Sequence, residues 1–93
     1  MSRPGPDTVP RLAPGCRVNE KPGQPVMLLI PEGALKLTGS SLSIVSRIDG
    51  IRTFTQIVQQ LQAEFTGMDP ATIEEQTAAF LDKLNARSVV RFA

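Results

Sequence analysis

The stretch Gly33–Leu42 constrains the fold most, because it passes from the periodicity of a strand to the start of a helix. Leu35 and Leu37 alternate with small or polar residues, so the two leucines share one face of a half-buried strand. Thr38 or Ser40 can then accept a hydrogen bond from the free N–H groups of the helix that follows. At the edge of a sheet, such a strand would leave its outer backbone groups open to another extended chain.

Two more strands are expected before this one. Cys16–Asn19 is short, and Val26–Ile30 is apolar at every position, which is typical of a central strand covered on both faces. The segments Glu20–Gln24 and Pro31–Gly33 have the proline and glycine of turns. The pattern therefore predicts an antiparallel meander with Val26–Ile30 in the middle.

Three helices are expected after the strands. The first spans Ser40–Ile48, the second begins with a capping box of Thr53 and Gln56, and the third has Asp69 as its N-cap. The residues predicted to face inward from the last two helices are Phe54, Ile57, Val58, Leu61, Phe65, Ile73, Thr77, Phe80, Leu81 and Leu84. The predicted fold class is α+β and winged helix-turn-helix-like, with a three-stranded antiparallel β-meander followed by a three-helix bundle.

The two ends of the chain are expected to add little to this core. Residues 1–10 are rich in proline and contain little that can be buried, so they are expected to be a flexible N-terminal segment. Residues 11–93 are expected to form one domain, in which Leu12–Gly15 is a turn. Val89–Phe92 is expected to be a short strand or an apolar tail.

The residue types present exclude most catalytic and metal-binding chemistry. The chain has no histidine, and the single cysteine, Cys16, can form neither an internal disulfide nor a Cys/His zinc site. No apolar run approaches the roughly 18 residues that span a bilayer. We therefore expect a cytoplasmic binding module with no enzymatic activity, no cofactor, no metal and no membrane partner.

Nucleic acid is the first alternative partner, because winged helices often place their third helix in the major groove of DNA. The net charge is only +1, and no Lys or Arg lies between Arg52 and Lys83. The early turns of the third helix carry Glu74 and Glu75, which phosphates would repel. Winged-helix DNA binding is therefore a minor alternative.

The order of motifs resembles the PqqD family of pyrroloquinoline quinone (PQQ) biosynthesis from Pro10 to Phe92. The matching motifs are Pro10–Val18, Val26–Thr38 and Ile48–Val58. The chain departs from the family pattern at Thr38, where asparagine is common, and at Ser40-Ser41-Leu42, where Thr-Ala-Ala is usual. These changes keep the capping chemistry.

The resemblance implies a peptide chaperone. Members of the family bind the precursor peptide PqqA and present it to the radical S-adenosylmethionine enzyme PqqE. Related recognition elements of ribosomally made peptide pathways add a leader peptide as an extra strand against the third helix. Mapped by position, the peptide-binding residues would be Ala34, Leu35, Lys36, Leu37, Thr38, Ile73, Gln76, Thr77 and Phe80. Lys36 could then pair with an acidic residue of the peptide.

Three further alternatives stay open. The domain could recognise the leader peptide of a different modified-peptide pathway. It could also be a homodimer that exchanges strands through a hinge at Pro31–Gly33, because open edges favour swapping. Finally, Leu35, Leu37, Ile73 and Phe80 could each be ordinary core residues.

Overall fold

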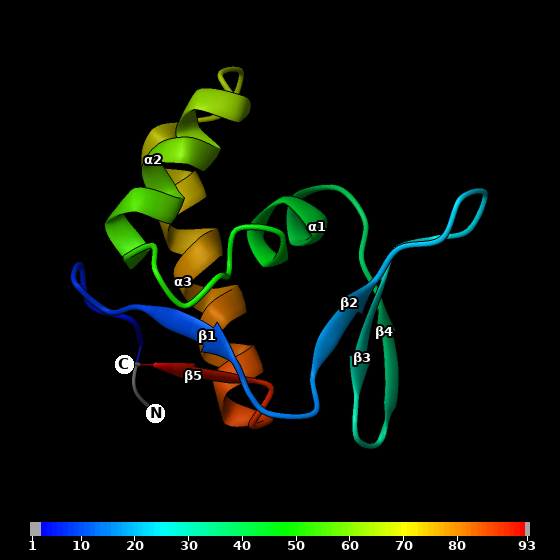
Figure 1. Cartoon of the computed structure of the whole chain (residues 1–93). Coiled ribbons are helices and arrows are strands. Elements are labelled where there is room, and N and C mark those ends of the chain that lie inside the picture. Colours follow the sequence, from blue (N-terminus) through cyan, green and yellow to red (C-terminus); the bar gives the residue numbers. More distant parts are fainter. Residues whose placement is uncertain (1–2, 93) are drawn as a thin grey trace.

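The computed structural model describes residues 3–92, which form two small antiparallel sheets and three helices (Figure 1). In chain order the elements are β1 (Pro10–Leu12), β2 (Arg17–Asn19), β3 (Met27–Ile30), β4 (Gly33–Lys36), α1 (Ser40–Val45), α2 (Phe54–Glu64), α3 (Pro70–Ala86) and β5 (Val90–Phe92). The α+β class and the meander β2–β3–β4 are confirmed, with β3 in the middle. Within residues 3–92, no helix combines the length and hydrophobicity that crossing a bilayer requires.

The meander is covered on one face only. Leu28 and Ile30 of β3 are buried in the core, whereas Met27 and Leu29, on the opposite face, are half-buried. The sequence-based expectation that β3 is covered on both faces is therefore wrong. The physical reason is that the three helices all lie to one side of this sheet, so its outer face has no layer against it (Figure 1).

The hydrophobic core lies between the covered face of the meander and the inner stripes of α2 and α3. Four of the five predicted stripe residues of α2 are confirmed as buried, namely Phe54, Ile57, Val58 and Leu61. The fifth, Phe65, is the C-cap residue after the helix and is only half-buried. On α3 the buried set is Ile73, Thr77, Ala78, Leu81 and Leu84, while Phe80 is only half-buried. Thr77 satisfies its hydroxyl locally, because its Oγ1 donates to the carbonyl of Ile73 over 2.7 Å.

The N-terminal cap predicted for α2 is observed, whereas that predicted for α1 is not. The capping box is confirmed, since Gln56 N–H donates to the Thr53 side chain and Gln56 Oε1 accepts from Thr53 N–H. At α1 the N-cap is Gly39 rather than Thr38 or Ser40, and no side chain caps the helix. Gly39 has φ 56°, a left-handed conformation that glycine adopts without steric cost.

Two other predicted helix features are also corrected. The helix α1 ends at Val45, well before the predicted Ile48. Asp69 is the N-cap residue of α3, but its side chain makes no capping bond to the backbone. Its Oδ2 instead accepts from the Thr72 hydroxyl over 3.3 Å.

The second sheet joins the two ends of the chain, which the sequence analysis did not anticipate. β1 pairs with β5 in the register Pro10↔Phe92, Arg11↔Arg91 and Leu12↔Val90. Val89–Phe92 therefore does contribute a strand, while Leu12 belongs to a strand rather than a turn. The two ends of the described chain lie close together as a result (Figure 1).

The segment before β1 contacts the helical core. The carbonyls of Thr8 and Pro6 accept from the N–H groups of Phe54 and Thr55, at 2.7 and 3.2 Å, at the start of α2. Pro10, predicted to end a flexible segment, is buried in β1, so that boundary is wrong. Met1 and Ser2 of the predicted segment, and Ala93 of the predicted domain, lie outside the described residues.

Candidate functional site

The free edge of β4 exposes backbone hydrogen-bonding groups in a fixed pattern. The Leu37 N–H donates to the carbonyl of Val26 over 2.9 Å, which extends the register Met27↔Lys36 and Leu28↔Leu35 by one residue. Hydrogen-bonded and non-hydrogen-bonded pairs alternate along an antiparallel ladder. The backbone N–H and C=O groups of Ala34 and Lys36 therefore point away from β3.

The opposite edge of the meander, formed by β2, has fewer open backbone N–H and C=O groups. On β3, residues 28 and 30 face β4, so Met27 and Leu29 bond to β2. Within β2 only Val18 then directs its N–H and C=O outward, because Arg17 and Asn19 face β3. Of the two edges, β4 provides the longer row of open groups for pairing with an extended chain.

This row ends before Thr38. The Thr38 N–H donates to Ser41 Oγ over 3.1 Å, and the Thr38 carbonyl accepts from the Ser41 hydroxyl over 2.7 Å. The Ser41 N–H also donates to this carbonyl over 3.2 Å. Thr38 is thus placed next to the edge, but its backbone groups are already satisfied by the turn into α1.

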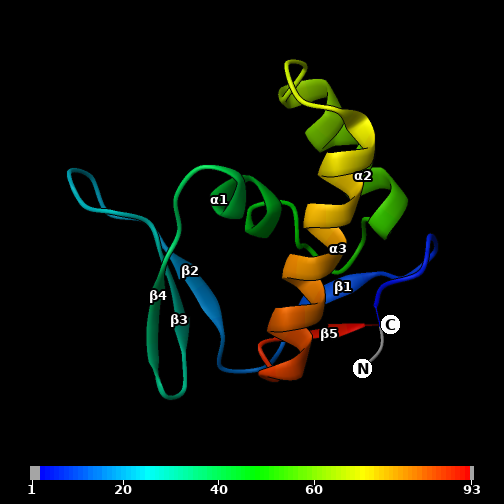
Figure 2. The same ribbon diagram turned by 180° about the vertical axis from the view of Figure 1, so that it is seen from behind.

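An apolar groove runs between β4 and the C-terminal half of α3, and we call it the β4–α3 groove. Leu28, Leu35 and Leu37 line it from the meander, and Phe80 and Leu84 line it from α3. In Figure 2, β4 and the orange C-terminal half of α3 stand at about the same height, with the β3–β4 turn at the lower end of β4. A strand added to β4 would direct every second side chain into this groove, since Leu35 faces it.

The predicted site residues are divided between two hollows. Leu35, Lys36, Leu37 and Phe80 line the β4–α3 groove. The other three α3 residues, Ile73, Gln76 and Thr77, line a smaller hollow of about 20 Å³ with residues from α1 and α2. Ala34 and Thr38 are exposed beside the edge and line neither hollow.

Burial separates these residues further. Leu37, Ile73 and Thr77 are only 4%, 4% and 1% exposed, so their side chains belong to the core in the free protein. Leu35 and Phe80 are half-buried and present apolar surface to the groove. Ile73 and Thr77 therefore need the protein to rearrange before a peptide can touch them, whereas Phe80 does not.

The sequence-based site did not include three residues that line the groove at the C-terminal end of α3, namely Lys83, Leu84 and the C-cap residue Arg87. The signal was present, because positions 80, 83, 84 and 87 follow the i, i+3, i+4, i+7 spacing of one helix face. Choosing the correct half of α3 required the position of β4, which the helix periodicity does not contain.

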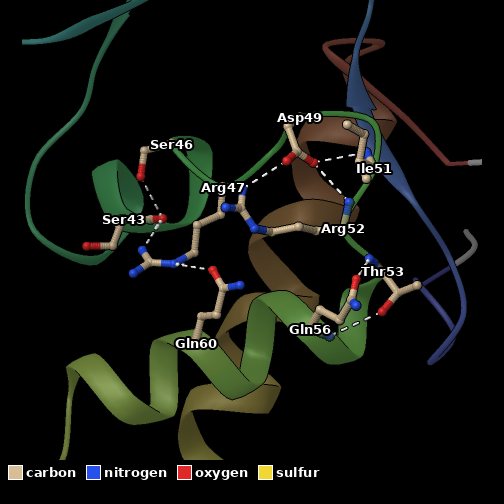
Figure 3. Close-up of polar contacts among 9 residues, drawn as sticks. All are labelled: Ser43, Ser46, Arg47, Asp49, Ile51, Arg52, Thr53, Gln56 and Gln60. Atoms are coloured by element: carbon tan, nitrogen blue, oxygen red, sulfur yellow. Dashed lines mark hydrogen bonds and ion pairs between the residues drawn. The ribbon is translucent and has the colours of Figure 1, made fainter.

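A separate polar network fixes the connection between α1 and α2 (Figure 3). Asp49 Oδ1 accepts from the N–H groups of Ile51 and Arg52, and Asp49 Oδ2 pairs with the Arg52 guanidinium at 2.9 Å. The backbone hydrogen bonds from Arg52 and Ile51 lower the pKa of the Asp49 carboxyl below its ordinary value of 3.8. Arg47 bridges Ser43 and Gln60 beside it.

This network extends to the last turn of α2. Glu64 accepts from the Ser43 hydroxyl at 2.8 Å and pairs with Arg47 at 2.8 Å. The Ser43 hydrogen bond, followed by that of Arg47, lowers the pKa of the Glu64 carboxyl. None of these residues lines the β4–α3 groove, and among residues 3–92 no group of three Cys, His, Asp or Glu side chains could hold a metal ion.

Comparison with known proteins identifies the class. The family described as "Coenzyme PQQ synthesis protein D (PqqD)" matches residues 26–90. The chain belongs to this PqqD family. A PqqA binding protein of Azotobacter vinelandii is 36% identical over 89 residues, or 95% of each chain. A PqqA binding protein of Pseudomonas aeruginosa is 38% identical over 88 residues, or 94% of each chain.

Solved structures share the fold. The solution structure of the PqqD truncation of Methylobacterium extorquens PqqCD, described as a functional and stand-alone recognition element for ribosomally synthesised and modified peptides, is 30% identical. It aligns with a TM-score of 0.75 over 97% of this chain and 95% of its own. The heterocyclase TruD is 25% identical, with a TM-score of 0.61 over 92% of this chain and 12% of its own.

Proposed function

We propose that this protein is a peptide chaperone of PQQ biosynthesis that binds the precursor peptide PqqA in the cytoplasm, without catalysis of its own. Relatives covering nearly the whole chain are PqqA binding proteins, and a structural relative is a peptide recognition element. In this role the protein presents the bound peptide to the radical S-adenosylmethionine enzyme PqqE.

The observation that carries this proposal is the outward direction of the Ala34 and Lys36 backbone groups beside an apolar groove. A peptide strand at this edge exchanges up to four hydrogen bonds with the backbone, independently of its sequence. Its alternate side chains enter the β4–α3 groove and contact Leu35 and Phe80, which gives selection. The proposed peptide-binding edge is therefore Ala34–Lys36, with Leu37 and Thr38 at its end.

The remaining predicted α3 residues lie where only a peptide that extends beyond the β4 edge would reach. Ile73, Gln76 and Thr77 line the adjoining hollow toward the start of α3, and Gln76 is exposed there. A peptide longer than the β4 edge would continue over Gln76. In this arrangement Ile73 and Thr77 form the buried wall of the hollow and do not contact the peptide directly.

A second candidate function is recognition of the leader peptide of another modified-peptide pathway. The similarity to TruD favours it, because a heterocyclase of much greater length contains a region of the same fold. Strand addition does not distinguish the two cargoes, since the backbone of any extended peptide can pair with β4. Selection between PqqA and another leader peptide must therefore come from the side chains that line the β4–α3 groove.

The test is an amide NMR titration of the isotope-labelled protein with synthetic PqqA, beside an unrelated leader peptide and a DNA duplex. We expect saturable shifts on Ala34–Lys36 and on Phe80 and Leu84 with PqqA, and none with DNA. Sedimentation of the same samples reports the oligomeric state, because a strand-swapped homodimer would consume the β4 edge. Absence of shifts with PqqA would contradict the proposed function. A complex with PqqA that does not bind PqqE would contradict the delivery step.

A further inference from the structure

The α3 side of the β4–α3 groove carries two cations that have no partner within the described chain. Lys83 and Arg87 both line the groove and are both exposed. Neither takes part in an ion pair among residues 3–92. Among the described residues that line the groove, none is acidic. The groove therefore has positive charge that nothing from the described chain neutralises.

The two cations lie beside the apolar side chains on the same stripe of α3. Lys83 follows Phe80 by three residues, and Arg87 follows Leu84 by three. At about 1.5 Å of rise per residue, the stripe from Phe80 to Arg87 extends for roughly 10 Å. Alternate residues of an extended peptide are about 6.8 Å apart. The groove can thus receive two consecutive inward side chains, one against Phe80 and the next near the cations.

The position of these cations at the end of α3 gives them a second effect, since a helix C-terminus favours positive charge. Lys83 is in the last turn, and Arg87 is the C-cap residue. Cations on any face of the last turn would stabilise the helix C-terminus in this way. It does not require that both line the groove next to the open strand edge.

From this arrangement we propose that the β4–α3 groove selects acidic peptides. The bound segment has an apolar side chain against Phe80 and an Asp or Glu two residues along, which pairs with Lys83 and Arg87. This inference rests on the proposed strand addition and names the chemistry that distinguishes one peptide from another.

Lys36 would contact a different residue of the same peptide. Its side chain shares the outer face of the meander with its register partner Met27, opposite to Leu35. A peptide carboxylate beside Lys36 would therefore be one residue out of phase with a carboxylate beside Lys83. Lys36 also borders the groove. Its side chain alternates with that of Leu35, so Lys36 and the two α3 cations contact alternate residues of the added peptide.

The test measures the affinity of synthetic PqqA for wild type, Lys83→Gln, Arg87→Gln and the double variant. The matched control is Lys21→Gln, which removes the same charge from the exposed β2–β3 turn. A second peptide has every Asp and Glu of PqqA replaced by Asn and Gln. All the substituted side chains are exposed, so the variants should fold, and circular dichroism checks this.

We expect each groove substitution to weaken PqqA binding by roughly fivefold, and the double variant by more. The amide peptide should bind wild type weakly and show no further loss with the variants. Between about 50 and 500 mM NaCl, the affinity of wild type should fall more than that of the double variant, because salt screens the pairs. Lys21→Gln should match wild type.

Two results would overturn the inference while leaving the proposed function intact, and a third would overturn both. Undiminished binding of PqqA by the double variant, or of the amide peptide by wild type, would show that the groove cations do not select charge, while strand addition stands. Failure of wild type to bind PqqA at all would overturn both.

Discussion

Leu37 donates its backbone N–H to the carbonyl of Val26 over 2.9 Å, and this bond turns the backbone of its neighbour Lys36 toward the free edge of β4. The direction follows from the alternation of an antiparallel ladder. The proposed function depends on this direction, because a strand can only be added where donors and acceptors are open.

Replacing Lys36 with proline tests that direction. Proline removes the outward N–H and is tolerated on the open side of an edge strand, so Lys36→Pro should fold but lose PqqA affinity by tenfold or more, on the order of 1.5 kcal/mol. Isothermal titration calorimetry measures the change. Lys36→Ala keeps the N–H and should lose much less, which separates the backbone from the side chain. Greater loss in Val18→Pro than in Lys36→Pro would mean that the β2 edge binds the peptide.

Phe80 is an apolar groove residue that can be substituted while the hydrophobic core stays intact. Because it is half-buried, Phe80→Ala should leave a folded protein and weaken PqqA binding by roughly tenfold. Leu37→Ala, at a 4% exposed position, should instead lower the free energy of unfolding by about 2–5 kcal/mol. Glu75→Ala, on the exposed side of α3, should leave the affinity unchanged. An equal affinity loss in Phe80→Ala and Glu75→Ala, both folded, would contradict the position of the groove.

Asp49 should make the stability of the protein depend on acid pH. Its pKa is lower in the folded than in the unfolded chain, so its contribution is complete above the unfolded value near 3.8 and is lost as the pH falls through the folded value. Asp49→Asn should therefore be less stable than wild type at pH 7, with the difference shrinking in acid. Urea denaturation across this pH range measures it. A constant difference would show that the carboxylate charge is not responsible.

The capping box should contribute to stability without affecting binding. Thr53→Ala removes the side-chain acceptor of the Gln56 N–H and should lower the free energy of unfolding by about 1 kcal/mol. Urea denaturation followed by circular dichroism measures this. PqqA affinity should equal that of wild type, since neither residue lines the groove. Loss of affinity would indicate that α2 takes part in binding.

Deleting residues 1–8 tests whether the N-terminal segment is a passive tail. The deletion removes the carbonyls of Pro6 and Thr8 that accept from the first N–H groups of α2, and it uncovers the helix beneath them. We expect a loss of roughly 1–3 kcal/mol in the free energy of unfolding. An unchanged urea midpoint would support the flexible segment that the sequence predicts.

Local chemistry determined much of this fold from the sequence. The order of the meander, the capping box at Thr53 and the buried stripe of α2 all depend on residues within a few positions of one another, where periodicity and turn chemistry act directly. The same is true of the β4 segment, whose alternation places Leu35 on the covered face. The predicted N-cap of α1 was wrong because Gly39, with φ 56°, takes that position and has no side chain to cap with. The neighbouring hydroxyl of Ser41 bonds to the backbone N–H and carbonyl of Thr38 instead of to the helix.

The tertiary structure decided what lies far apart in the chain. β1 and β5 pair as an antiparallel sheet across almost the whole length of the chain. Because no turn connects these short strands, the sequence carries no local signal for their pairing, which depends on the packing of both ends against the helical core. The docking of α3 beside the meander likewise divided the predicted site, leaving Ile73 and Thr77 in the core and bringing Lys83 and Arg87 to the groove. Helix periodicity defined a face of α3, and only packing chose which half of that face meets β4.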